Sequence, residues 1–296
     1  MEQQTTALRL PVPGRRWRHR SAAFGVATGV AVSMLGACSP NSAAPEADVP
    51  LQSGAQTAIS VDPMGVSGIA VGPNNVVYLG GSGGFSTLTP DSAQPTPLKL
   101  AEQPVVTSMA MAPDGTLSFV TLGGAIESIS PGATTAKSLP FDKFQQLSSI
   151  AVAQDGTVYL GDNEHDKLLM LAPGASAPTE RPVDGVGGLG HMVIDGDDNV
   201  YVSMRGKIVK IAKGATTAES VAGATDHAGG LAVDAAGNLY VTDLQAKTVS
   251  RMSARGSDWV QLPFSGLQTP ADIAVDGDGN VYVINKLGSE IARLAA

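Results

Sequence analysis

The sequence predicts an all-β fold, a six-bladed β-propeller with four antiparallel strands in each blade. The first observation is a pattern that occurs six times: an apolar run, a turn built on Asp, Gly or Asn, and a second apolar run that carries an aromatic residue. The copies read GIAVGPNNVVYL, SMAMAPDGTLSFV, SIAVAQDGTVYL, HMVIDGDDNVYV, GLAVDAAGNLYV and DIAVDGDGNVYV. The second is the spacing of the aromatic residues, which recur after 41, 40, 42, 39 and 42 residues: Tyr78, Phe119, Tyr159, Tyr201, Tyr240 and Tyr282. Such a period indicates propeller blades.

The first 37 residues are expected to be an export signal. Five arginines precede an uncharged apolar stretch from Ser21 to Leu35. This stretch is too short to span a membrane, which takes about 20 apolar residues. A basic segment, a short apolar segment and small residues at the exit are typical of a signal peptide.

The exit of this segment resembles the lipobox of bacterial lipoproteins. It reads Leu35-Gly36-Ala37-Cys38, and Cys38 is the only cysteine of the chain. In that family the signal is cut before the cysteine, which then carries lipid such as palmitate, and more than one acyl chain makes such an anchor stable. The resemblance implies attachment to the outer face of the cytoplasmic membrane through Cys38. An ordinary secretory signal with an incidental cysteine is the alternative.

The rest of the chain is acidic and has no other thiol. Without residues 1–37 it has 14 basic and 26 acidic residues, a formal charge of −12. An acidic surface argues against binding nucleic acid or anionic lipid heads through charge. With Cys38 acylated, no disulfide and no cysteine metal site or nucleophile remains. Residues 38–56, rich in Ser, Ala and Pro, are expected to be the anchor and a flexible tether, and 57–296 the propeller.

Each repeat divides into four strands, A to D. In the fourth repeat we expect strand A at 191–194, B at 200–203, C at 207–212 and D at 217–221. Further third strands are expected at 125–130, 167–171, 248–252 and 290–294. Asp-Gly and Gly-Asn pairs in the A–B turns supply positive φ without steric cost.

The ring is expected to close through the N-terminal strand. The sixth repeat stops after strand C, and residues 57–61, TAISV, match strand D of the fourth repeat, TAESV. Pairing of 57–61 with the last strand C would complete the sixth blade and cover an edge that could aggregate.

Residues shared by the repeats are assigned to the scaffold. The strand-B aromatics are expected to pack between blades, and small residues are expected where strand A crowds the axis: Ala70, Ala110, Ala151, Ala232 and Ala274. A residue present in every blade serves a need that all blades share. Function is therefore expected where the repeat is broken.

The motifs GLAVDAAGNLYVTD, DIAVDGDGNVYV and LPFSGLQTPADIAV resemble NHL repeats. They are most similar to the extracellular sensor domains of mycobacterial receptor Ser/Thr kinases of the PknD type, over the whole of 57–296. The likeness is weaker in the B–C loops, where the family often has Asn-Asn-Arg, and no kinase domain is present. The resemblance implies a module that binds an envelope protein or a small ligand, needs no cofactor and is not a catalyst.

Topology predicts which face carries function. The D–A and B–C loops lie on one face, called the loop face here, and the short A–B and C–D turns lie on the opposite turn face. Variable loops on a rigid ring are where binding groups are found. The residues expected on the loop face are His191, His227, Asp272, Asp162, Asn163, His165, Asp243 and Asn285.

His191 stands where other repeats have Gly, Ser or Asp, close to the axis. Imidazole titrates near neutrality, so His191 is a candidate ligand-binding or acid–base group. The alternative is a polar residue at a channel mouth, hydrogen-bonded to backbone or water. His165 lies in a charged loop, where a solvated surface position is expected.

An enzymatic alternative is judged by whether the chain has the residues that the enzyme family requires. Streptogramin lyases are similar in repeat design, and that likeness implies a lyase or hydrolase with His191, His227 and Asp272 around the channel mouth. Their strand B carries Trp-Phe-Thr-Glu where this chain has Tyr-Val-Thr-Asp or a variant of it. Their catalytic His lies two residues before the strand-A aliphatic residue, at positions that are Gly190, Gly229 and Ala271 here.

Metal sites have weaker support. Peptidyl-amidating lyases hold zinc with His from several blades, but no spacing of the three propeller histidines supports such a site. Residues 276–280, DGDGN, begin like a calcium loop, yet the twelfth position is Leu287 and not an acidic ligand. A hairpin turn is therefore predicted there, and neither a catalytic residue nor a metal ligand is assigned.

Overall fold

The computed structural model describes residues 54–62, 65–143 and 149–296. The chain divides into two compact units, Met1–Asp48 and Val49–Ala296, and every described residue belongs to the second. The predicted signal peptide, Cys38 and most of the predicted tether lie outside the described residues. Within the described ranges, no helix has the length and apolar character needed to cross a bilayer.

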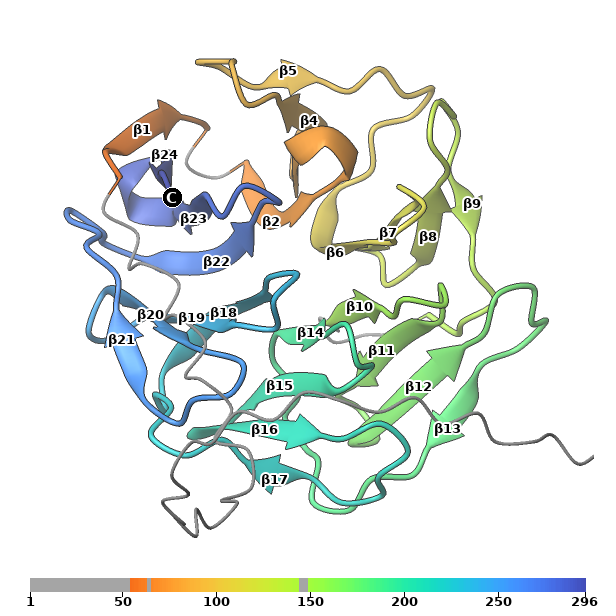
Figure 1. Ribbon diagram of the computed structural model, residues 1–296. Coiled ribbons are helices and arrows are strands. Elements are labelled where there is room, and N and C mark those ends of the chain that lie inside the picture. The colour runs from red at the N-terminus through yellow and green to blue at the C-terminus, as the bar shows by residue number, and fades with distance from the viewer. Residues whose placement is uncertain (1–53, 63–64, 144–148) are drawn as a thin grey trace, which may run out of the picture. The chain divides into compact units, whose positions relative to one another are not determined.

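Six four-stranded sheets surround a central axis (Figure 1), which confirms the predicted six-bladed propeller. Blades 1 and 2 are β2 (Val66–Val71), β3 (Val77–Gly81), β4 (Gly84–Leu88) and β5 (Thr96–Pro97), then β6 (Val106–Met111), β7 (Leu117–Thr121), β8 (Ile126–Ile129) and β9 (Lys137–Ser138). Blades 3 and 4 are β10 (Ile150–Val152), β11 (Val158–Asp162), β12 (Lys167–Leu171) and β13 (Thr179–Arg181), then β14 (Met192–Ile194), β15 (Val200–Met204), β16 (Lys207–Ile211) and β17 (Glu219–Ser220). Blades 5 and 6 are β18 (Ala228–Val233), β19 (Leu239–Asp243), β20 (Thr248–Met252) and β21 (Trp259–Gln261), then β22 (Pro270–Val275), β23 (Val281–Asn285), β24 (Glu290–Leu294) and β1 (Gln56–Ser60). Two short 3-10 turns are η1 (Pro73–Asn75) and η2 (Lys286–Gly288).

The N-terminal strand closes the ring as predicted. β1 pairs antiparallel with β24, from Gln56 opposite Leu294 to Ser60 opposite Glu290. The observed strand begins and ends one residue earlier than 57–61. Val61 makes a single further backbone bond, donating to the Ser289 carbonyl at 3.0 Å, outside the ladder.

The outer strands are shorter than predicted. In blade 4 the structure has strand D only at Glu219–Ser220, where 217–221 was expected. Two residue pairs join it to β16, and its other side is the free edge of the sheet. Very short edge strands are one way in which sheets avoid edge-to-edge association.

The strand-B aromatics pack in the core as predicted. Phe119, Tyr240 and Tyr282 are almost wholly buried, with exposed fractions of 0%, 1% and 1%, whereas Tyr78 is half-buried. Cationic side chains also cover some rings: Arg293 lies 5.6 Å from the centre of the Tyr282 ring. These rings are therefore occupied by scaffold contacts, and ligand stacking is not needed to explain them.

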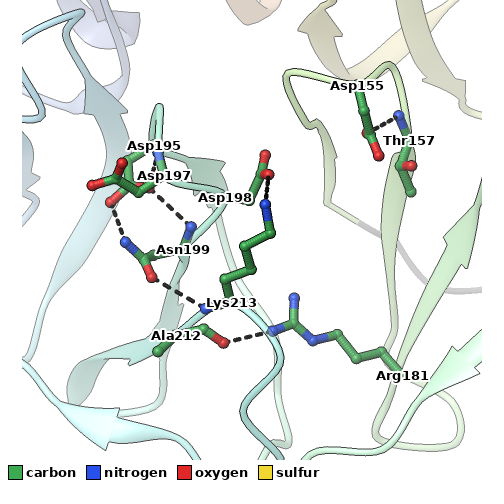
Figure 2. Close-up of polar contacts among 9 residues, drawn as sticks. All are labelled: Asp155, Thr157, Arg181, Asp195, Asp197, Asp198, Asn199, Ala212 and Lys213. Carbon is green, nitrogen blue, oxygen red and sulfur yellow. Dashed lines mark hydrogen bonds and ion pairs between the residues drawn. The ribbon is translucent and has the colours of Figure 1, made fainter. Parts of the chain in front are cut away.

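In blades 4, 5 and 6 the A–B turn on the turn face is held by an Asp and an Asn four residues later, an arrangement called the Asp–Asn bracket here. In blade 4, Asp195 Oδ1 accepts from the Asp197 and Asn199 N–H groups at 3.0 and 2.9 Å, and its Oδ2 accepts from Asn199 Nδ2 at 2.8 Å. Asn199 Oδ1 in turn accepts from the Lys213 N–H of the C–D turn at 3.1 Å (Figure 2). The same bracket recurs at Asp276 and Asn280. Residues 276–280 thus form the predicted hairpin turn. The Asp276 carboxylate accepts hydrogen bonds from Asn280 within that turn.

Candidate functional site

The six A strands enclose a channel along the axis. Strand A lies at one edge of every sheet, and residues of all six A strands line a cavity of about 210 Å³. At the turn-face end the last residue of each strand A is aliphatic or Met: Val71, Met111, Val152, Ile194, Val233 and Val275. The side chains at this end of the channel are therefore apolar.

The loop-face end of the channel is polar. A second cavity of about 290 Å³ opens there and shares Ser108, Ser149, His191 and Asp272 with the first. These residues belong to six equivalent positions, each two residues before the strand-A alanine or, in blade 4, before Val193. We call them the mouth ring: Gly68, Ser108, Ser149, His191, Gly230 and Asp272. The mouth ring breaks the repeat at the point where the channel opens.

His191 and Asp272 contact each other across the mouth. His191 Nδ1 lies 3.3 Å from Asp272 Oδ1, although blade 5 separates their blades in the ring. The blade 5 member of the mouth ring, Gly230, makes this contact possible. A Cβ on Gly230 would lie 2.7 Å from Asp272 Oδ1 and 2.6 Å from Asp272 Cα. A side chain at position 230 would therefore displace the carboxylate.

The Asp272 carboxylate is buried and held by backbone. Its Oδ1 accepts from the N–H of Ile273 at 2.9 Å, and its Oδ2 accepts from the N–H of Ile69 on β2 at 3.3 Å. A β-bulge between Pro270 and Asp272 precedes it in β22. Bulges redirect side chains and are common beside functional sites. Asp272 is thus aimed at the axis and fixed there.

Opposing effects act on the pKa of His191. Burial among the A strands disfavours the imidazolium, and the Lys286 ammonium does so too. The charge and hydrogen bond of Asp272 outweigh both, so the pKa of His191 lies above its ordinary value of 6.5. The imidazole remains accessible, because 40% of its side-chain surface is exposed.

Lys286 is a mouth residue that the sequence pattern did not single out. It begins η2, directly after β23, and its side chain lines the mouth cavity with His191 and Asp272. The Lys286 N–H donates to the Thr269 carbonyl at 3.1 Å, which fixes the backbone of this turn. The only sequence feature that marks Lys286 is that its B–C loop lacks the Asn-Asn-Arg often found in NHL repeats.

His227 does not join the mouth. It lines neither the mouth cavity nor the channel cavity and pairs with its neighbour Asp226, Nδ1 to Oδ1, at 2.5 Å. Its backbone N–H donates to Thr225 Oγ1 at 3.0 Å, and its charge helps Thr225 to lower the pKa of Asp243 against the effect of burial. The predicted trio of His191, His227 and Asp272 is thus a pair plus a separate surface histidine.

The other loop-face residues hold loops together. Asn163 exchanges two hydrogen bonds with the Leu189 backbone, at 2.8 and 2.7 Å, and so joins blade 3 to blade 4. Asn285, wholly buried, accepts from the Gln268 and Thr269 N–H groups at 2.8 and 3.0 Å.

Two Asp residues end strand B in the same manner. Asp162 accepts from the Glu164 N–H at 3.0 Å and from the largely exposed His165 ring at 2.8 Å. Asp243 accepts from the N–H groups of Gln245 and Ala246 at 2.8 and 2.7 Å. Their carboxylates accept hydrogen bonds from backbone N–H groups of the B–C loops, so both residues have a structural role. Within the described ranges, no group of three or more His, Cys, Asp or Glu is placed to hold a metal ion.

No protein-family model matches the chain, and no curated protein matches it. Solved propellers are similar in fold. A streptogramin B lyase superposes with a TM-score of 0.60 at 12% identity, over 81% of this chain and 96% of that one. A chain of a nidogen–laminin complex gives 0.60 at 16% identity, over 70% and 84%. An auxiliary nutrient-binding protein from Bacteroides ovatus gives 0.61 at 14% identity, over 80% and 70%. At these identities the likeness shows the fold alone.

Proposed function

We propose that the protein is a lipid-anchored binding module of the bacterial cell envelope, which holds a small ligand at the mouth of its propeller channel. The observation that carries the proposal is the His191–Asp272 pair, which faces an accessible cavity of about 290 Å³. Ligand sites are typically concave, with a few convergent polar groups on a rigid frame. The lipobox supports the anchor, and the NHL-like repeats support a binding role.

Binding explains the mouth better than the lyase alternative does. That alternative used His191, His227 and Asp272 as one site, and His227 lines neither cavity. Two of the similar folds, a nutrient-binding protein and a chain from a nidogen–laminin complex, are binders by name. A streptogramin B lyase is an equally good structural match, so the choice rests on the residues and not on the fold.

The chain leaves the propeller on the face opposite the mouth. The Ala295 N–H, at the turn-face end of the last strand, donates to the Ala55 carbonyl at 3.4 Å. The described part of the chain thus begins on the turn face, opposite the mouth.

Mass spectrometry of the full-length gene product, isolated from bacterial membranes in detergent, tests the anchor and the binding together. The intact mass is expected to correspond to a chain that begins at Cys38 and carries acyl groups. Under native conditions a further small-molecule adduct is expected. The adduct disappears in His191→Ala, which removes the mouth imidazole.

His227→Ala is the matched control, since its ring is similarly exposed but lines neither cavity. It retains the adduct. Cys38→Ser loses the acyl mass and keeps the ligand if purified from the soluble fraction. An unacylated wild-type chain contradicts the anchor. Absence of an adduct from wild type, or equal adduct in His191→Ala, contradicts binding at the mouth.

A further inference from the structure

We infer that the ligand of the channel mouth carries one carboxylate, bound jointly by Lys286 and His191. The inference rests on the proposed function, because it names the chemistry of the same site. It follows from three features of the mouth: its free hydrogen-bond donors, its net charge and the lining of its two cavities.

The acceptors at the mouth are used and the donors are free. Asp272 accepts from two backbone N–H groups and from His191 Nδ1. His191 therefore keeps its Nε2 for a ligand. The Lys286 side chain is exposed and makes no ion pair with any described residue. A site rich in donors fits a ligand group rich in acceptors.

The charge at the mouth fits a monoanion. The charged groups that line it are Lys286, His191 and Asp272. With His191 protonated they sum to one positive charge, in a chain whose formal net charge is −8. A carboxylate neutralises this excess. A dianion such as phosphate at neutral pH would overcompensate it beside Asp272 and meet added repulsion.

The lining of the two cavities fits a small organic acid. Ser108 and Ser149 stand in the mouth ring, and most residues around the channel cavity beneath have aliphatic side chains, although polar atoms form more of its lining than apolar atoms do. The two cavities, about 290 and 210 Å³, share residues, and each is smaller than the roughly 300–1,000 Å³ of most ligand sites, which favours a small ligand. A short hydroxy acid has a carboxylate, a hydroxyl and a small apolar part.

The test is a titration of the full-length protein with lactate and with its neutral isostere lactamide, followed through the His191 ring signals in NMR spectra. His191→Gln assigns the signals. Lactate is expected to shift them saturably and to bind about tenfold more tightly than lactamide, a difference of about 1.4 kcal/mol, since a carboxylate accepts charge-assisted hydrogen bonds. Lys286→Met is expected to remove this preference. Lys207→Met, an exposed lysine that lines neither cavity, is expected to preserve it.

The outcomes separate this inference from the proposed function. Lactamide binding as tightly as lactate, or an unchanged lactate affinity in Lys286→Met, overturns the carboxylate and leaves the mouth as a ligand site. No saturable shift with either probe also overturns the carboxylate, and the mass spectrum of the purified protein then decides whether another ligand occupies the mouth.

Discussion

At the residue scale, the site depends on one contact between blades that are not neighbours. His191 and Asp272 meet because Gly230 has no side chain and because two backbone N–H groups hold the carboxylate. The contact favours the imidazolium. A histidine whose pKa is raised on folding adds stability that is fully present below its unfolded pKa and is lost as pH rises through its folded pKa.

Asp272→Asn is expected to lower the pKa of His191 below 6.5, since burial and Lys286 then act unopposed. An NMR pH titration of the ring signals measures this directly. The stability difference between wild type and Asp272→Asn is expected to be largest below pH 6.5 and to shrink as pH rises through the folded pKa of His191. In a His191→Gln background the difference no longer shrinks over this range. An unchanged pKa in Asp272→Asn would mean that the pair is not formed.

At the element scale, hydrogen bonds within the A–B turns account for the Asp and Asn that blades 4, 5 and 6 share. In blades 5 and 6 the bracket extends to strand B: the hydroxyls of Tyr240 and Tyr282 donate to Asp234 and Asp276 at 3.0 Å. In blade 4, by contrast, the Tyr201 hydroxyl has no such bond among the described residues. The repeats thus share a sequence pattern but not every contact.

Tyr282→Phe is expected to reduce the free energy of unfolding by about 1 kcal/mol, the usual net value of one hydrogen bond. For a domain of this size that is a fall in Tm of roughly 2–4 °C, measurable by thermal unfolding. Tyr201→Phe is the matched control and is expected to leave Tm almost unchanged. Equal losses in the two variants would show that ring packing, and not the Asp276 bond, accounts for the effect.

Much of the fold follows from local pattern, whereas the site only partly does. Strand B and the closing strand are visible in sequence because every blade needs the same packing and turn. The repeat phase also places His191 and Asp272 at the mouth. The repeat phase does not identify Lys286, whose place at the mouth depends on the turn η2. It does not identify Gly230 either, because its role depends on the contact between His191 and Asp272 across blade 5. His227 is on the expected face, but its loop, tied to Thr225, keeps it out of both cavities.

At the scale of the whole molecule, the two faces of the propeller differ in the polar groups that they carry. The turn face carries repeated Asp–Asn brackets and the junction with the N-terminal segment, and the loop face carries the unpaired donors of the mouth. The closing strand β1 completes blade 6. Its first residue lies at the turn face, so the N-terminal segment joins the propeller opposite the mouth. We therefore expect ligand recognition on the loop face alone.

Hydrogen exchange with and without a deproteinised envelope extract tests this central assignment most directly. Added extract is expected to slow exchange in the loops that border the mouth, 186–192, 266–272 and 286–289, and to leave the A–B and C–D turns unchanged. His191→Ala is expected to abolish the protection, and His227→Ala to retain it. Protection confined to the turn face, or no protection of the mouth loops in wild type, would contradict the account.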